Sequence, residues 1–380
     1  MPNTIFDSSG LKSRARPGKL AGSEFNVAAH ALRGIASMMV FMAHILGGTA
    51  EHIYERFPNY VELIQAPWFL GRWAVGLFFV ISGFVILPSV LRYTPREFAW
   101  RRFMRLYPLF FFCSLVFIVL NAATNAYPKT NSIEAVFGGL LFLNLLTGTE
   151  QLTPNAWSLT FEVIFYIFTC VSVFFWVRKR NVAITLILAV AAVLFMLRYP
   201  AAIYFFFGVV IRIFYNYQYK KNRQWSVFWS RAAETILFII AIVSGSMYQF
   251  VNAPVDLGEP LAYLIMASTV AYFLLAVGPD SLSGKILNYR PLLYLGTVSY
   301  SLYLVHPYTY FACRKLFEKF NLFGENWLAS ISLFIFVATP ITLALTHVVH
   351  LAFERGPYNW VFHQRVYRKP TVGSEQKSAL

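Results

Sequence analysis

The feature that most constrains this chain is a set of long stretches without any Asp, Glu, Lys or Arg. Five such stretches of 19–23 residues occur, at 73–91, 106–128, 235–255, 260–279 and 291–313. About 18 apolar residues suffice for a helix that crosses the ~30 Å hydrocarbon core of a bilayer. Charged residues make up only 13% of the chain, about half of what a soluble domain carries. The sequence therefore predicts an all-α, polytopic integral membrane helical bundle, whose first partner is the lipid bilayer.

The positions of Lys and Arg indicate how many apolar segments cross the membrane. Eleven segments can be drawn, but eleven crossings would place the basic loops at 178–180 and 220–223 outside, against the positive-inside rule. We therefore exclude 133–149, a short and glycine-rich segment, and expect it to be re-entrant or interfacial. About ten transmembrane helices then remain, with both termini cytoplasmic: 27–50, 71–91, 106–122, 157–177, 181–197, 199–218, 232–250, 260–279, 291–313 and 327–353.

This topology divides the chain into three regions. We expect a cytoplasmic tail at 1–26, a transmembrane domain at 27–356 and a second cytoplasmic tail at 357–380, in a multi-pass protein of the plasma (inner) membrane. The net charge is +15, but the Lys and Arg residues follow the sides of the membrane and form no basic face for a nucleic-acid duplex. Nucleic acid is therefore not an expected partner. The three cysteines lie in apolar segments without metal-ligand spacing, and no metal is expected.

Two ionisable side chains interrupt the first predicted span, LRGIASMMVFMAHILGG at 32–48. Arg33 and His44 are separated by three helical turns, which places them on one face about 16 Å apart. An arginine inside a span costs about 2.5–3.5 kcal/mol on insertion scales and needs a partner or a hydrated cavity. Two interpretations fit. Arg33 extends to the inner head groups while His44 bonds a neighbouring helix, or the two residues share a functional site.

The fourth predicted span begins with NAWSLTFEVIFY, at 155–166. Glu162 is the only charged residue in 151–177, and a carboxylate inside a span is usually functional or paired. Trp157 and Ser158 precede it, with Ser158 one turn away on the same face. In the second span, FFVISGF at 78–84 contains Ser82 among small residues that favour close helix contact. Ser82 and Ser158 are also candidate hydroxyl donors.

Further basic residues lie near the ends of other predicted spans. RRFMRLYP, at 101–108, contains three arginines at the cytoplasmic edge of the third span. They fit either an anchor of the positive-inside type or an anion site, because guanidinium groups suit phosphates. His306 lies near the outer end of its span, and His350 and Glu354 lie one turn apart at an inner end. For these histidines a structural role is the simpler interpretation. The three arginines are Arg101, Arg102 and Arg105.

Six of these motifs, in this order, resemble the acyltransferase-3 family of membrane-bound acyltransferases. They cover about residues 28–358: the Arg33–His44 pair, FFVISGF, RRFMRLYP, WSLTFE, SYSLYLVH and FERGP. The resemblance implies transfer of an acyl group, commonly acetyl from cytoplasmic acetyl-CoA, to sugar hydroxyls at or beyond the outer face. It also implies that Arg33 and His44 are the functional pair. The chain departs from the family pattern at two places. The family often has a second acidic residue after the glutamate of WSLTFE, where this chain has Val163, and it tends to end in Glu-Arg-Pro, where Gly356 here precedes Pro357. These departures weaken the roles assigned at those sites.

The chemistry of acyl transfer assigns roles to some of these residues. A base must take the proton of the acceptor hydroxyl, and neutral imidazole suits that task near pH 7. We expect His44 to be this base and Glu162 to orient it. Ser82 and Ser158 could donate hydrogen bonds or form a covalent relay.

The donor substrate assigns roles to the arginines. Arg33, with Arg101, Arg102 or Arg105, is expected to hold the phosphates of acyl-CoA at the inner end of the first span. The acceptor would be a glycan or glycolipid, such as an exopolysaccharide or lipopolysaccharide. The alternative is a polytopic transporter or flippase of a sugar or lipid-linked substrate, which would also place Arg, His and Glu in spans. Such proteins usually show internal repeats with matched broken helices, and the sequence shows no convincing pair.

Overall fold

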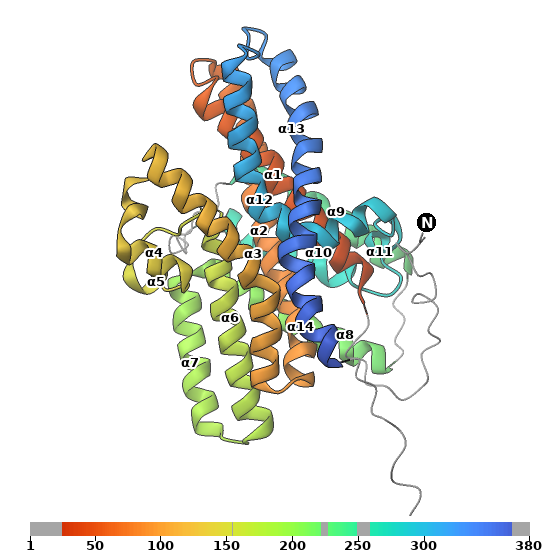
Figure 1. Cartoon of the computed structure of the whole chain (residues 1–380). Coiled ribbons are helices and arrows are strands. Elements are labelled where there is room, and N and C mark those ends of the chain that lie inside the picture. Colours follow the sequence, from red (N-terminus) through yellow and green to blue (C-terminus); the bar gives the residue numbers. More distant parts are fainter. Residues whose placement is uncertain (1–24, 154, 222–226, 249–258, 367–380) are drawn as a thin grey trace, which may run out of the picture.

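The computed structural model describes residues 25–153, 155–221, 227–248 and 259–366. Throughout these ranges the regular elements are all helices, as the sequence predicts (Figure 1). Seven helical segments in the described part are long and apolar enough to cross a membrane: Val27–His52, Pro58–Arg92, Pro95–Thr124, Trp157–Arg178, Pro200–Gln218, Ser230–Met247 and Trp327–Phe362. The chain is therefore a multi-pass membrane protein.

Each of the ten predicted spans coincides with a long helix. These helices are α1 (Val27–His52), α2 (Pro58–Arg92), α3 (Pro95–Thr124), α6 (Trp157–Val173), α7 (Val182–Arg198), α8 (Ile203–Lys221), α9 (Val227–Met247), α10 (Pro260–Ala276), α12 (Arg290–Lys319) and α13 (Trp327–Val349). Three of them fall outside the seven segments above. The two 17-residue helices α7 and α10 are apolar but shorter, about 26 Å each. The 30 residues of α12 give ample length, and this helix contains many of the polar residues described below.

The excluded segment 133–149 forms two short helices instead of a span. They are α4 (Ile133–Leu140) and α5 (Asn144–Thr147). The eight residues of α4 give a length of only about 12 Å, far less than the bilayer core. The chain bends between them at Phe142, whose φ is 57°. Together with the 3₁₀ turn η2 (Pro128–Asn131) they lie beside α3, at the left of Figure 1.

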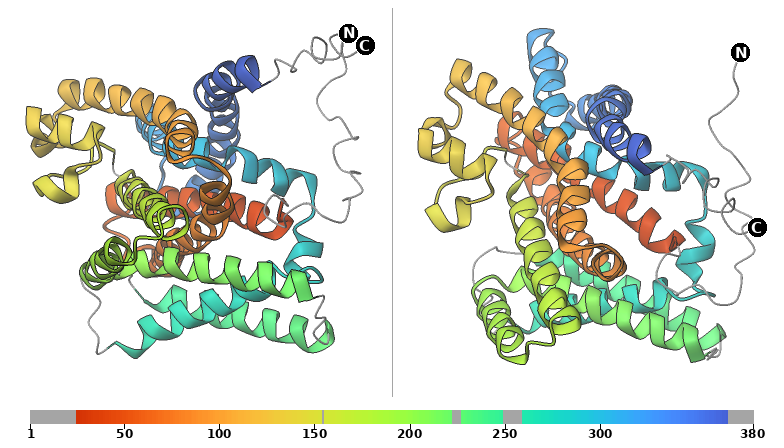
Figure 2. Two further views of the ribbon diagram at one scale, coloured as in Figure 1. Left: turned by 90° about the horizontal axis from the view of Figure 1, so that it is seen from below. Right: turned by 60° about the horizontal axis from the view of Figure 1, so that its bottom comes forward.

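Helix α1 is the central element of the bundle. It packs most extensively against α2 and α12, and α2 in turn packs against α8; Figure 2 shows α1 in red among these neighbours. The contact between α2 and α8 depends on Gly83 of FFVISGF, because a Cβ there would collide with the carbonyl oxygen of Phe205. The small residues of this motif therefore permit close helix packing, as expected. The arrangement places the polar residues of α1 between α2 and α12.

The remaining elements connect the long helices or extend them. The π-helical turns η3 (Phe174–Arg178) and η5 (His350–Arg355) continue α6 and α13, η4 (Pro200–Ala202) precedes α8, and α11 (Leu282–Ile286) follows α10. Directly after η5 comes α14 (Gly356–Val366), so the predicted second tail at 357–380 begins within a helix. The predicted first tail at 1–26 lies almost wholly outside the described residues.

Candidate functional site

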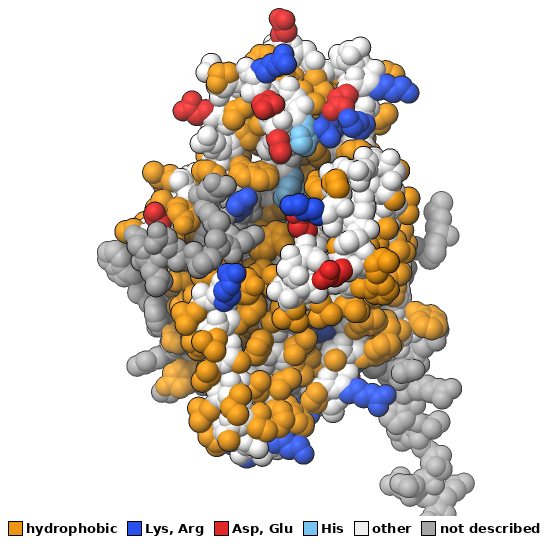
Figure 3. Space-filling model, turned by 90° about the vertical axis from the view of Figure 1, so that its left-hand side faces the viewer, with side chains coloured by type: hydrophobic (Ala, Val, Ile, Leu, Met, Phe, Trp, Pro, Cys, Tyr) orange, Lys and Arg blue, Asp and Glu red, His pale blue; other side chains and the backbone are white. Residues whose placement is uncertain are grey.

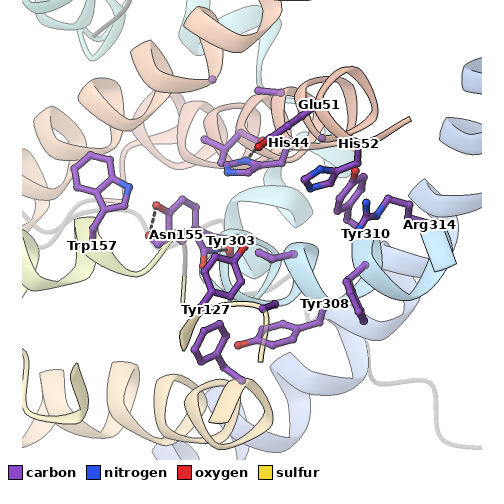
Figure 4. Close-up of a pocket in the computed structure, with 18 of the residues that line it drawn as sticks. His44, Glu51, His52, Tyr127, Asn155, Trp157, Tyr303, Tyr308, Tyr310 and Arg314 are labelled. Carbon is purple, nitrogen blue, oxygen red and sulfur yellow. Dashed lines mark hydrogen bonds between the residues drawn. The ribbon is translucent and has the colours of Figure 1, made fainter. Parts of the chain in front are cut away.

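A cavity of about 720 Å³ opens beside the C-terminal half of α1. Side chains from α1, α2, α3, α12 and the segment before α6 line it (Figure 4). In Figure 3 it is a hollow with pale blue histidine atoms, below a charged region and above a largely apolar face. Of the predicted site residues, His44 and Trp157 line this cavity. We call it the His44 cavity.

The helix itself orients the His44 ring. Nδ1 lies 2.8 Å from the carbonyl oxygen of Val40, one turn earlier in α1. Because a carbonyl oxygen can only accept, Nδ1 carries a proton, and the neutral ring keeps the lone pair of Nε2 available. The ring is half-buried, and the Trp68 ring lies edge-on to it at 5.5 Å between centroids. His44 therefore has the tautomer that a general base in this cavity requires.

A second histidine lies beside His44. The ring centroids of His306 and His44 are 4.9 Å apart. His306 is fully buried, and its Nδ1 lies 3.0 Å from the carbonyl oxygen of Leu302 in α12. Its Nε2 has no hydrogen-bond partner among the described residues. The motif SYSLYLVH thus brings to His44 a histidine for which the sequence favoured a structural role.

A hydrogen-bond network joins the start of α6 to α12 at the cavity. Tyr303 donates its hydroxyl proton to the carbonyl oxygen of Asn155 at 2.7 Å and accepts from Ser158 at 2.8 Å. The amide of Asn155 donates to the carbonyl oxygen of Tyr303. Ser158 thus acts here as one member of a buried network. The motifs gave no sign of a role for Asn155, two positions before WSLTFE, or for Tyr303, within SYSLYLVH.

Glu162 does not contact His44 in the way we expected. Its carboxylate accepts hydrogen bonds from Ser82 at 3.0 Å and from the hydroxyl of Tyr166. The Nδ1 position that Glu162 would have to hold is occupied by the Val40 carbonyl. The expected orientation of His44 by Glu162 is therefore wrong for this structure, and the helix backbone takes that role. Glu162 instead lies within electrostatic range of Arg33, in the N-terminal half of α1.

Arg33 lies within electrostatic range of two carboxylates in that half. It is close enough to Glu162, Glu354, Tyr166 and Arg105 to interact with them electrostatically. We call these five residues the Arg33 cluster. It contains two arginines and two carboxylates, so its formal charges balance. A charge inside a span requires such compensation.

The turn η5 supplies one of the carboxylates in the cluster. Glu354 is 6% exposed, and its Oε2 accepts hydrogen bonds from Ser301 at 2.7 Å and from His350 at 2.8 Å. The sequence indicated a helix-terminal pair of His350 and Glu354. The structure confirms the pair and adds that it is buried, with Glu354 within electrostatic range of Arg33.

The three arginines of RRFMRLYP have different environments. Arg101 forms an ion pair with Glu97 at 2.9 Å, donates to the Tyr358 hydroxyl at 3.2 Å and lies over the ring of Tyr93. Arg105 belongs to the Arg33 cluster, and Arg102 lies over the ring of Tyr166, which is in that cluster. Arg105 is therefore a member of the Arg33 cluster, Arg102 borders the cluster through Tyr166, and Arg101 is paired outside it.

The His44 cavity and the Arg33 cluster occupy different halves of α1. Arg33, Arg102 and Arg105 are absent from the described residues that line the cavity, as are Ser82 and Glu162. The predicted site residues thus form two groups, one around His44 and one around Arg33.

Comparison with known proteins identifies the family of the chain. Residues 26–347 match the model of a family described as an acyltransferase domain. No curated protein and no solved structure matches the chain significantly. The match begins at the start of α1, ends within α13 and covers most of the chain. The protein therefore belongs to the acyltransferase-3 family of membrane acyltransferases.

Proposed function

We propose that the protein is an O-acyltransferase that moves an acyl group, in the simplest case acetyl, from acyl-CoA to a hydroxyl of an extracytoplasmic glycan. An exopolysaccharide or a lipopolysaccharide would be a typical acceptor. Family membership supports acyl transfer. The observation that carries the proposed chemistry is a histidine with a free Nε2 at a cavity large enough for a substrate. Sites for small molecules commonly occupy about 300–1,000 Å³.

In the proposed reaction, Nε2 of His44 takes the proton from the acceptor hydroxyl as its oxygen attacks the thioester carbonyl. An O–C bond forms, and the tetrahedral intermediate collapses with loss of the C–S bond. The CoA thiolate leaves and takes the proton from His44, which returns to its neutral form. His306 lies against the same ring. No covalent acyl-enzyme is needed for this sequence.

The donor would bind at the Arg33 cluster. Arg102 and Arg105 lie at the end of α3 that the sequence places on the cytoplasmic side, where acyl-CoA is available. We assign them to the CoA phosphates. Glu162 and Glu354 balance Arg33, so we assign Arg33 to holding the cluster open along α1, with a smaller share in phosphate binding. The pantetheine arm would then extend along α1 toward His44.

We place the protein in the plasma (inner) membrane with ten spans. The transmembrane domain is residues 27–356, and both tails lie in the cytoplasm. Ten long helices support that count, and the basic loops follow the positive-inside rule. In this orientation Glu51 and His52, which are exposed cavity residues, face the outside. The acceptor would enter there.

The proposal is tested by comparing surface glycans from cells with and without the gene. We expect the ester content, measured by NMR before and after mild alkali, to disappear without the gene and to return with the wild-type copy. A transporter or flippase would instead change the amount or location of the glycan. Unchanged ester content together with altered glycan export would overturn the proposal in favour of that rival.

A further inference from the structure

A buried histidine–carboxylate pair lies where α13 ends, and the reaction proposed above does not use its histidine. Nδ1 of His350 lies 2.8 Å from Oε2 of Glu354, and both residues belong to the π-helical turn η5. Because an ionised carboxylate can only accept, Nδ1 carries the proton of this bond. π-Helical turns are rare and occur frequently at functional sites. The turn thus places a titratable ring in direct contact with a carboxylate of the Arg33 cluster.

The second ring nitrogen of His350 is available for a further partner. Nε2 of His350 has no hydrogen-bond partner among the described residues, yet it is not one of the sealed polar atoms, as Nε2 of His306 is. Of the His350 side chain, 9% remains accessible. With Nδ1 held by Glu354, Nε2 can take up a proton and then donate it to an anion.

The charges around Glu354 determine what a proton on His350 would do. Glu354 lies within electrostatic range of both Arg33 and Arg105. The two arginines and two carboxylates of the Arg33 cluster cancel, so the carboxylates offset the attraction of the guanidinium groups for a phosphate. A proton on His350 adds one positive charge in contact with Glu354. The cluster would then carry a net positive charge, as an anion site requires.

The other titratable groups near this pair do not provide such a change of charge. Arg33, Arg105 and Tyr300 interact electrostatically with Glu354, and arginine stays charged and tyrosine neutral near pH 7. The helices that flank η5 in the chain, α13 and α14, add two groups that have partners of their own. These are His347, bonded to Tyr294, and Tyr358, bonded to Arg101. Histidine is the side chain whose charge commonly changes between about pH 5 and 8, which singles out His350.

We infer that His350 is a further binding residue of the donor site, and that its protonated form supplies the positive charge that the Arg33 cluster lacks and holds a phosphate of acyl-CoA. This inference rests on the proposed function and adds a proton to the binding step. Protonated His350 pairs with Glu354, which leaves the guanidinium groups of Arg33 and Arg105 for phosphate. Acyl-CoA therefore binds together with one proton taken from the cytoplasm, and loss of that proton weakens binding.

The first test measures KM for acetyl-CoA against pH, with the purified full-length protein in phosphatidylcholine proteoliposomes. The acceptor is a set of oligosaccharides from the cell's own envelope glycan, freed of esters by mild alkali. In the wild type we expect KM to rise about tenfold from about pH 6 to about pH 8, the worth of one hydrogen bond to a charged group. In His350→Gln, KM should be high throughout and change less than about twofold.

His347→Gln is the matched control. His347 lies one turn before His350, but it is exposed and its Nδ1 is 2.7 Å from the hydroxyl of Tyr294. This variant should keep the pH dependence of the wild type. The phosphate monoester of acetyl-CoA gains negative charge as the pH rises. Its own titration would therefore lower KM and cannot imitate the expected rise.

A second measurement needs no variant and uses CoA itself as the probe. Calorimetric titration of the wild type, in two buffers with different ionisation enthalpies, gives the number of protons exchanged for each CoA bound. We expect uptake of up to about one proton near neutral pH, because the protonated form of His350 is the one that binds phosphate. Titration of the phosphate monoester would instead release protons.

The outcomes separate this inference from the proposed function. The same KM profile in the wild type and His350→Gln, or no proton uptake with CoA, would overturn the role of His350 and leave the proposed function intact. A lower melting temperature of His350→Gln with an unchanged KM profile would give the ring a structural role and would also overturn it. CoA binding with proton uptake, but without any acetyl transfer by the wild type, would overturn the proposed function and leave the phosphate site.

Discussion

The two halves of α1 handle polar side chains in opposite ways. Around Arg33 the charges balance, and the carboxylates of Glu162 and Glu354 each accept two hydrogen bonds. Around the His44 cavity, several buried polar atoms have no partner in the described part of the chain. A group of charges with satisfied hydrogen bonds rigidifies a bundle, whereas buried polar atoms left unpaired cost stability. The comparison teaches that polar residues within one span need not share one task.

The largest effect should come from removing the proposed base. We expect His44→Gln to lower the rate of acyl transfer by about 10²–10⁴-fold, the usual contribution of a general base, with little change in folding. The measurement is acetyl transfer in proteoliposomes together with the melting temperature. His52→Gln is the matched control, since His52 lines the same cavity but is exposed. Equal activity in the two variants would remove His44 from the mechanism.

The carboxylates of the Arg33 cluster should respond mainly in stability. Glu354→Gln removes the carboxylate that pairs with His350 at 2.8 Å and leaves Glu162 as the remaining carboxylate of the cluster, and breaking a buried pair costs about 3–5 kcal/mol. We expect a clear drop in the melting temperature in detergent. A second change, Arg33→Met, should restore part of the loss because it removes the uncompensated charge. If the double variant is less stable than Glu354→Gln, the proposed charge balance is wrong.

A comparison of Arg101 and Arg105, both in α3, tests where the donor binds. Arg105 lies in the Arg33 cluster, whereas Arg101, one turn earlier, is paired with Glu97. We expect Arg105→Gln to raise KM for acetyl-CoA about tenfold, since it removes a charged contact to phosphate, and Arg101→Gln to change it less than twofold. The same KM in both variants would place the CoA phosphates elsewhere.

The smallest effect should come from Ser82. Its hydroxyl donates to Glu162, and Tyr166 remains bonded to that carboxylate in Ser82→Ala. We expect the free energy of unfolding to fall by about 1 kcal/mol, the net worth of one hydrogen bond, with the transfer rate nearly retained. Complete loss of transfer in a stable variant would instead show that the reaction requires the Ser82 hydroxyl. Ser158→Ala tests the other serine in the same way.

Much of the architecture follows from the sequence because the bilayer permits few alternatives. Charge-free stretches marked the long helices, and glycines at 138, 139 and 148 marked the segment that breaks into α4 and α5. The motifs also contain most of the polar residues around His44 and around Arg33.

The pairing of side chains could not be read from the sequence. Spacing along α1 placed Arg33 and His44 on one face, but it contained no information on which carboxylate meets which of them. The sequence leads us to expect Glu162 at His44, but its carboxylate accepts from Ser82 and Tyr166 and lies within electrostatic range of Arg33. The start of α6 is bonded to α12 through Asn155 and Tyr303. Those contacts join residues 148 positions apart. Similarly, only the packing of α12 on α1 reveals His306 beside His44.

The hydrogen bonds that orient the rings of His44 and His306 have a consequence for how these residues move. Each ring is hydrogen-bonded to a carbonyl of its own helix, His44 to Val40 and His306 to Leu302. The spacing between their free nitrogens is therefore set by how α1 lies on α12. If α1 slid along α12 or rotated against it, the surroundings of Nε2 of His44, the proposed proton acceptor, would change directly. Occupants at either end of α1 could in this way tune its basicity through rigid-body movement alone.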